Sequence, residues 1–250
     1  MWCRCYELCG SVRLFSRNGR RRVQALEIGG EVISFMEIRD CDLLVTTTGL
    51  SAGNLQELKD CIAAAPTGSI YHHFYGRLLR PEFDEPEYNN DFASWVNWNL
   101  RDKALAEKLS MVVPSTLKDL EQVREKLLQV IDERMEEVAH PVETLLDERF
   151  YLLRAHMVVF DAGLCLEEPE DLFKAIDSLH QGSIYYHIVD ARHRRLNRGN
   201  DFSEWFRELG SEYVHVADRL AGLDPYFSSV EGIRRTLGGI LESSLPEHDV

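Results

Sequence analysis

The chain has 250 residues, of which 44% are hydrophobic, and a formal net charge of −14. This length allows one large domain or two small ones, and the composition supports a packed core and excludes a disordered chain. The acidic balance disfavours nucleic acid as a partner, because binding to phosphates needs cationic side chains that displace counterions. No apolar run approaches the roughly 18 residues of a membrane span, so we expect no membrane partner and a cytoplasmic protein.

Residues 1–22 form a basic segment that contrasts with the rest of the chain. They contain six arginines and one acid, Glu7, which gives +5 (6 − 1) and leaves −19 (−14 − 5) for the remainder. We expect a disordered leader, since short charged chain ends are usually unstructured. An extension upstream of the true start belongs to the same interpretation, and a basic arm and an Arg-rich transit segment are the alternatives.

The cysteines predict neither a disulfide framework nor a metal site. Three of them, in the leader, have a spacing that lacks the fourth ligand of a structural zinc site. These are Cys3, Cys5 and Cys9. The other three lie in apolar stretches and are predicted to be small core residues. These are Cys41, Cys61 and Cys165.

In chain order, the first predicted elements are strands. Phe35–Thr48 and Phe150–Phe160 are rich in β-branched and aromatic residues and end at Gly49 and Gly163, a pattern typical of strands. Because a lone strand leaves its edges unpaired, we expect these two to pair with each other or with two shorter strands. The shorter strands are predicted at Val23–Ile28 and Val32–Phe35, around a turn at Gly29-Gly30.

Each long strand is predicted to be followed by about four helices. Helical spacing of apolar residues and residues that favour helix N-caps define them. The first helices follow Asn54 and contain Leu172–Leu179, the second begin at Ser69 and Ser183, the third begin at Asn90-Asp91 and Asn200-Asp201, and the fourth begin near Ser115 and Ser228.

Two sequence blocks in these helices occur twice, in the same order. SIYHHF at 69–74 returns as SIYYHI at 183–188, an offset of 114 (183 − 69). NDFASW at 90–95 returns as NDFSEW at 200–205, an offset of 110 (200 − 90). The repeat predicts tandem copies of one unit. We therefore expect a mainly α (α+β) protein with two pseudo-symmetric units, residues 23–140 and 141–250, the second packed on the first.

The repeated blocks resemble an uncharacterised bacterial and archaeal family of unknown function, with tandem S-I-Y-Y-H-F and N-D-F-S-x-W motifs. The likeness covers roughly residues 30–245, with His72 in place of the family's Tyr and Ile188 in place of its Phe. The resemblance transfers no activity and no catalytic residue. It suggests carbohydrate metabolism as a context.

The candidates for catalysis are two histidine–aspartate pairs. If the second and third helices are antiparallel neighbours, His73 can approach Asp91, and His187 can approach Asp201. Such a pair can act as a general base or help to hold a metal. Alternatively, the aspartates cap helices and the histidines are core residues with satisfied ring nitrogens.

Candidates for ligand binding are two arginines at matching places in the strands (154 − 39 = 115) and several aromatic residues. The arginines are Arg39 and Arg154, and the aromatics include Tyr71, Tyr185, Trp95 and Trp205. The aromatics could line a sugar-stacking or peptide groove, or fill the core. A basic stretch, Arg192–Arg198, is interpreted as a solvated loop. Alternatively, it could pair with the acidic loop between the second and third helices of the other copy, or it could bind an anion.

The sequence favours a non-catalytic binding or regulatory module for a protein or a small ligand, without metal or cofactor. The alternative is a hydrolase-type or metal-assisted enzyme that uses the His/Asp pairs. Signatures of other enzyme classes, such as a phosphate-binding G-x-x-x-x-G-K-[ST] loop, do not occur in the sequence.

Overall fold

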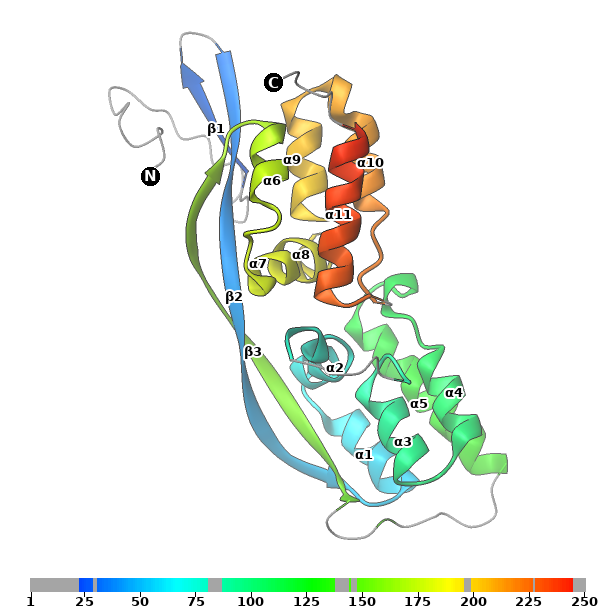
Figure 1. Ribbon diagram of the computed structural model, residues 1–250. Helices are drawn as coiled ribbons and strands as arrows, with labels where there is room; N and C mark the ends of the chain where they lie inside the picture. Colours follow the sequence, from blue (N-terminus) through cyan, green and yellow to red (C-terminus); the bar gives the residue numbers. More distant parts are fainter. Residues whose placement is uncertain are drawn as a thin grey trace. The chain divides into compact units, whose positions relative to one another are not determined.

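The computed structural model of the protein describes residues 23–28, 31–80, 87–137, 144, 148–195, 199–226 and 228–244 (Figure 1). The leader and the Gly29-Gly30 turn predicted from the sequence lie outside the described residues. The chain divides into two compact units. The continuous unit is Leu43–Val158, and the discontinuous unit combines the chain up to Asp42 with the chain from Val159 onward.

Three strands form a sheet in the order β1-β2-β3. They are β1 (Val23–Ile28), β2 (Glu31–Ala52) and β3 (Phe150–Leu166). β1 pairs with β2 in antiparallel fashion, with Val23 opposite Met36. Thr48 donates a hydrogen bond to the Leu152 carbonyl and Thr46 contacts that of Arg154, so β3 runs antiparallel to β2 (Figure 1). The predicted strand pairing is therefore confirmed.

Both long strands continue beyond the glycines at which the sequence predicted their ends. Gly49 lies inside β2 with φ +79°, and Gly163 lies inside β3 with φ +70°. In each case the glycine N–H donates to a side chain two residues earlier, Thr47 or Asp161. Glycine tolerates positive φ without a steric penalty, so a local kink replaces the predicted strand end.

The described residues of the continuous unit form five α-helices besides its parts of β2 and β3. They are α1 (Leu55–Ala64), α2 (Thr67–Tyr75), α3 (Asp91–Trp98), α4 (Lys103–Ser110) and α5 (Leu120–Glu137), with 3₁₀ turns at Gly76–Leu79 and Pro114–Thr116. Their apolar faces meet in a core that includes Leu58, Ile70, Phe92 and Leu127, each fully buried. Burial of these faces, rather than helix propensity, stabilises helices of only 8–18 residues.

The discontinuous unit has a similar series of helices. They are α6 (Pro169–Ala175), α7 (Gln181–Ile184), α8 (Ala191–Arg194), α9 (Asp201–Leu209), α10 (Val214–Ala221) and α11 (Val230–Ser244), with a 3₁₀ turn at Ser211–Tyr213. A π-helical segment, Tyr185–Asp190, joins α7 to α8. The core here is strongly aromatic, with Tyr185, Tyr186, Phe202, Trp205 and Phe206 all fully buried.

The predicted helix starts at Asn54, Asn90-Asp91, Asn200-Asp201 and near Ser228 are confirmed. Those at Ser69, Ser183 and near Ser115 are wrong, and α5 begins only at Leu120. The side chains of Asn54, Asn90 and Asn200 accept hydrogen bonds from backbone N–H groups in the first turns of α1, α3 and α9. α2 and α7, however, begin two residues before Ser69 and Ser183. Pro66 is the N-cap residue of α2, with a φ of −64° that the proline ring fixes, and it offers no side-chain cap.

The prediction of a mainly helical protein with a small sheet is confirmed. α4 and α10 were not predicted as separate helices; α4 packs on α3, and α10 packs on α9. None of the described helices is both long and apolar enough to cross a bilayer.

Candidate functional site

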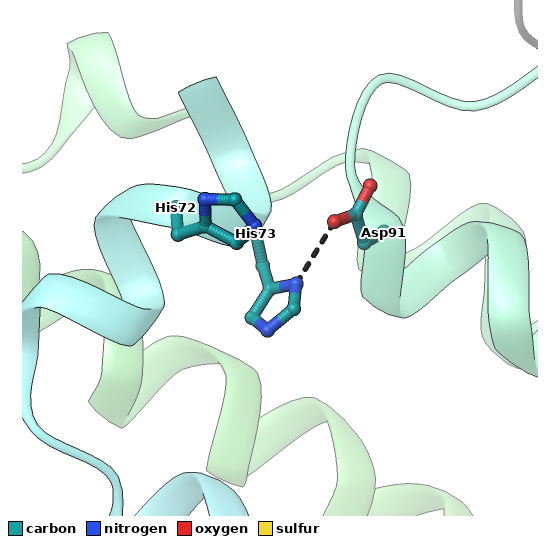
Figure 2. Close-up of side chains that lie close together, drawn as sticks. All are labelled: His72, His73 and Asp91. Atoms are coloured by element: carbon teal, nitrogen blue, oxygen red, sulfur yellow. Dashed lines mark hydrogen bonds and ion pairs between the residues drawn. The ribbon is translucent and has the colours of Figure 1, made fainter. Parts of the chain in front are cut away.

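His73 of α2 and Asp91 of α3 meet in the continuous unit (Figure 2). Asn90 caps α3 and leaves Asp91 as its first helical residue, where a carboxylate interacts favourably with the helix dipole. His73 lies on the buried face of α2, 3% exposed, and its Nδ1 is 2.8 Å from Asp91 Oδ2. The predicted approach of the histidine to the aspartate is therefore confirmed.

The other ring nitrogen of His73 fixes its tautomer. The backbone N–H of Leu153, in β3, donates a hydrogen bond of 3.1 Å to His73 Nε2. A nitrogen that accepts a hydrogen bond carries no proton, so in the neutral ring the proton is on Nδ1 and is donated to Asp91. Both nitrogens are thus engaged, and the imidazole attaches α2 to β3.

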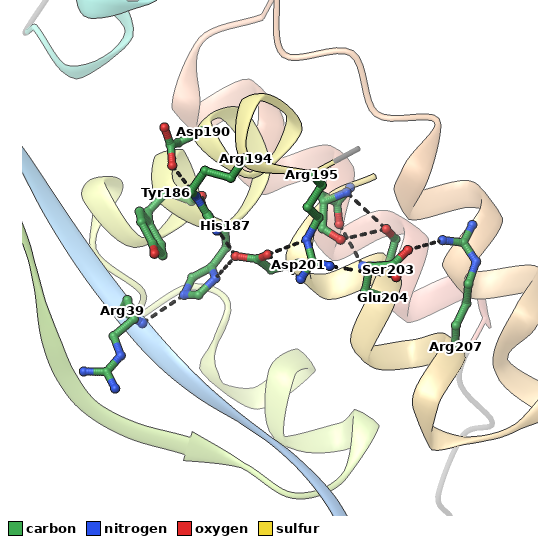
Figure 3. A network of polar contacts seen from close by, with 11 residues as sticks. Arg39, Tyr186, His187, Asp190, Arg194, Arg195, Asp201, Ser203, Glu204 and Arg207 are labelled. Carbon is green, nitrogen blue, oxygen red and sulfur yellow. Dashed lines mark hydrogen bonds and ion pairs between the residues drawn. The ribbon is translucent and has the colours of Figure 1, made fainter. Parts of the chain in front are cut away.

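His187 repeats this arrangement in the discontinuous unit (Figure 3). The backbone N–H of Arg39, in β2, donates to His187 Nε2 at 2.9 Å, and His187 Nδ1 lies 2.9 Å from Asp201 Oδ2. The side chains of His187 and Asp201 are both 0% exposed. The histidine again joins a helical segment to the backbone of a strand.

Two arginines surround the Asp201 carboxylate (Figure 3). Arg194 Nη2 is 3.0 Å from Oδ2, and Arg195 Nε is 2.8 Å from Oδ1. Burial opposes the charge of this carboxylate. The hydrogen bond from His187 and the arginine charges outweigh that cost, and the pKa of Asp201 is lowered. The interpretation of this basic stretch as a solvated loop is wrong for Arg194 and Arg195.

Arg194 is held on further sides. Its Nε donates to Asp190, and its guanidinium lies 4.2 Å from the centre of the Tyr186 ring, within the range of a cation–π interaction. We call Tyr186, His187, Asp190, Arg194, Arg195 and Asp201 the His187 cluster. Its charged groups are paired and largely enclosed, as a stabilising network requires.

The corresponding cluster in the continuous unit is less enclosed. We define the His73 cluster as His72, His73, Arg80 and Asp91. Arg80 Nη2 lies 2.7 Å from His72 Nε2 but 3.7 Å from Asp91 Oδ2. The Arg80 side chain is 44% exposed and that of Asp91 is 25% exposed. The carboxylate is therefore accessible to solvent here, whereas Asp201 is not.

His72 is the unusual member of this cluster. It is 1% exposed, and its Nδ1 has no hydrogen-bond partner. Burial, followed by the neighbouring charges of His73 and Arg80, lowers the pKa of His72 to about 4. The ring is neutral at pH 7, and the bond from Arg80 shows that Nε2 carries the lone pair.

His72, His73 and Asp91 each offer a potential metal-ligand atom, and these atoms lie within 4.8 Å of one another (Figure 2). They do not form an equivalent set of three. For Nδ1 of His73 to bind a metal, its proton would have to leave or move to Nε2, where it would face the Leu153 N–H. His72 and Asp91 are free of this constraint.

The candidate ligand-binding residues are dispersed. Arg39 pairs with Glu37 and, at 3.3 Å, with Asp161, while Arg154 is exposed beside Gly68. Trp95 is buried and donates to the Glu148 carbonyl. Tyr185 and Trp205 are fully buried, and Tyr71 is half-buried against Tyr75. In this structure the three buried rings belong to the core.

Two members of the His73 cluster, His72 and Arg80, were not among the candidates predicted from the sequence. The sequence did contain a signal for His72. The repeated block differs between its two copies at only two positions, and at one of them His72 stands where the other copy has Tyr186. Arg80 precedes the loop that separates α2 from α3, and only the fold returns it to His72, eight residues earlier.

The chain belongs to a protein family whose description is Family of unknown function (DUF5752), which matches residues 34–242. The sequence-based resemblance to a family of unknown function is thereby supported. A solved structure, that of OrfY from Thermoproteus tenax, is similar: it is 29% identical with a TM-score of 0.71, over 84% of this chain and 95% of that chain. No curated protein matches.

Proposed function

We propose that the protein is a non-catalytic binding or regulatory module for a protein or small-molecule partner. One observation carries this proposal: all four ring nitrogens of His73 and His187 are engaged, two by aspartates and two by strand N–H groups. A histidine in this state has no lone pair to offer to a substrate proton, and these imidazoles serve to attach helices to strands.

We further propose that the module arose by duplication of a strand-and-helix segment. The support is an offset of 114 residues between matching features up to the second helices, which becomes 110 residues from Asn90 and Asn200 onward. It relates His73 to His187 and Gly49 to Gly163. It also relates Gly68, which packs against Arg154 and Ala155, to Gly182, which packs against Asp40 and Cys41. In each case the packing partner comes from the other copy.

The enzymatic alternative makes a different demand on the same residues. As a general base, His73 or His187 would have to release its aspartate and accept a substrate proton at Nδ1, or release a strand N–H and accept it at Nε2. Either step leaves a buried polar group without a partner, at a cost of about 1–3 kcal/mol. His187 is in addition completely buried, so no substrate reaches it without local opening.

Isosteric substitutions distinguish the two functions. In H73Q and H187Q, the glutamine oxygen can accept the strand N–H as Nε2 does, and in H73N and H187N the asparagine N–H₂ can donate to the aspartate as Nδ1–H does. The matched control is H156Q, because His156 is exposed on β3. We expect lower melting temperatures for all four variants. The melting temperature of the control should equal that of the wild type.

Activity is tested in the same proteins with p-nitrophenyl phosphate, ester and glycoside substrates, with and without divalent metal ions. No turnover that depends on His73 or His187 is expected. Turnover that H73Q or H187Q abolishes while the folded fraction stays that of wild type would overturn the proposal. Compounds that bind without turnover should raise the free energy of unfolding by RT ln(1 + [L]/Kd), and this is measured as a higher melting temperature.

A further inference from the structure

The His73 cluster places a cationic group between an imidazole and a carboxylate. Arg80 Nη2 is 2.7 Å from His72 Nε2 and 3.7 Å from Asp91 Oδ2. The position thus suits positive charge, offers one nitrogen and one oxygen ligand, and lies at the partly exposed side of the cluster. An anion would meet the Asp91 carboxylate there, so the site selects against negative ligands.

The His187 cluster shows what a permanently occupied version of this position looks like. At an offset of 114 residues, Arg194 corresponds to Arg80, Tyr186 to His72 and Asp190 to Gly76. Asp190 and Asp201 both bind Arg194, which also lies over the Tyr186 ring. The arginine is fixed, and the tyrosine offers no metal-binding nitrogen.

The His73 cluster lacks each of these restraints. Gly76 has no side chain to bind Arg80, the distance to Asp91 is longer than that between Arg194 and Asp201, and the Arg80 side chain is 44% exposed against 28% for Arg194. Arg80 is therefore freer than Arg194 to turn into solvent, and a metal ion bound to His72 Nε2 would replace the hydrogen bond that Arg80 gives up. Its departure would leave His72 Nε2 and the Asp91 carboxylate facing one position.

We propose that His72 and Asp91 bind a divalent transition-metal ion, which replaces the Arg80 guanidinium. The His72 Nε2 lone pair and one Asp91 oxygen are the protein ligands, and water completes the coordination. His73 acts as a positioning residue, because its Nδ1–H holds the carboxylate of Asp91. The inference rests on the proposed binding function and adds a ligand class to it.

The ligand set indicates which ions bind. An imidazole with a carboxylate favours Zn²⁺, Co²⁺ or Ni²⁺ over Mg²⁺ and Ca²⁺, which prefer oxygen ligands. Zinc–ligand bonds of about 2.0–2.2 Å bring ligand atoms to roughly 3.5 Å from one another, and one ligand atom of His72 and one of Asp91 already lie within 4.8 Å. Two protein ligands predict micromolar affinity, below that of structural zinc sites with four.

Calorimetric titration of the full chain with ZnCl₂, CoCl₂ and MgCl₂ tests the inference. Cys3, Cys5 and Cys9 are replaced by serine in every protein, because thiolates also bind zinc. We expect one Zn²⁺ per chain with micromolar Kd and no measurable Mg²⁺ binding. The control is H180A, since exposed His180 lies 3.1 Å from Asp40 and forms an accessible His–carboxylate pair outside the His73 cluster.

Two variants change the affinity in opposite directions. H72Y/G76D gives the His73 cluster the residues of the His187 cluster and should weaken Zn²⁺ binding at least tenfold. R80A removes the competing cation and should strengthen it about three- to tenfold. Circular dichroism without metal confirms folding, and R80A decides alone if the double variant misfolds. The absence of saturable binding, equal binding by H72Y/G76D, or weaker binding by R80A would overturn the inference.

The outcomes for the two proposals are separable. If no metal binds and no turnover depends on His73, the metal site fails and the non-catalytic module stands. If the zinc-loaded protein hydrolyses a test substrate and H73Q abolishes this at unchanged Zn²⁺ affinity, the site stands and the non-catalytic function fails.

Discussion

Removal of a carboxylate charge should affect the two clusters very differently. D201N and D91N each replace a carboxylate by a neutral amide of the same shape. In both cases the carboxylate accepts a hydrogen bond from the neighbouring histidine. Asp201 is 0% exposed and binds two arginines, whereas Asp91 is 25% exposed and has one arginine at 3.7 Å. The comparison isolates the contribution of an enclosed charge network.

The magnitudes follow from burial. Loss of one partner from a buried ion pair costs about 3–5 kcal/mol, and Arg194 and Arg195 are 28% and 23% exposed, so they can partly turn to water. We expect D201N to lower the unfolding free energy by about 3 kcal/mol. In D91N, the Asn oxygen can still accept the His73 proton, and the loss is a weakened hydrogen bond and helix–dipole interaction of about 1 kcal/mol.

Urea unfolding followed by circular dichroism at pH 7 measures both values. Amide hydrogen exchange locates them, because the Arg39 N–H donates to His187 and the Leu153 N–H donates to His73. D201N should accelerate exchange at Arg39 and leave Leu153 protected. A D91N protein as unstable as D201N, or a D201N protein within 1 kcal/mol of wild type, would refute the reasoning.

Three further predictions follow from packing and charge. G182A should lower the free energy of unfolding by more than about 2 kcal/mol, because the added Cβ would overlap the Cys41 carbonyl. G68A should change it by no more than about 1 kcal/mol, because the nearest contact of the added Cβ is at 3.3 Å. Equal shifts in melting temperature for the two variants would contradict this. Burial, with smaller contributions from nearby acids, raises the pKa of Cys41 to about 12. Iodoacetamide should therefore label Cys41 only after unfolding, and rapid labelling of Cys41 in the native protein, detected by peptide mapping, would contradict this prediction. The folded-state pKa of Asp201 is lowered below its unfolded value of about 4, so the contribution of this carboxylate to the free energy of unfolding is complete above pH 4 and is lost as the pH falls further. The urea midpoint should therefore decline less steeply from pH 5 to 2 in D201N than in the wild type.

Local sequence signals predicted the histidine–aspartate pairs. Asn90 and Asn200 cap the helices that Asp91 and Asp201 begin, and helical spacing places His73 and His187 on the buried faces of the preceding helical segments. Both signals act within a few residues, so one chain suffices to read them.

The remaining contacts of the site depend on long-range pairing. His73 meets an N–H group 80 residues later in the chain, and His187 meets one 148 residues earlier. Nothing in a strand's sequence states which of its N–H groups faces a helix. Arg194 and Arg195 were similarly misread, because a run of arginines resembles a solvated surface unless the buried Asp201 beside it is known.

Each half of the polypeptide lacks a component that only the other half carries. A fragment 23–140 contains His73 without Leu153, and a fragment 141–250 contains His187 without Arg39. We therefore expect neither product of a cut at the midpoint to fold on its own, although the sequence repeat suggests such a unit. Two such fragments would be complements for a split-protein reporter. If the halves arose by the duplication proposed above, a single copy would need a strand from a second copy.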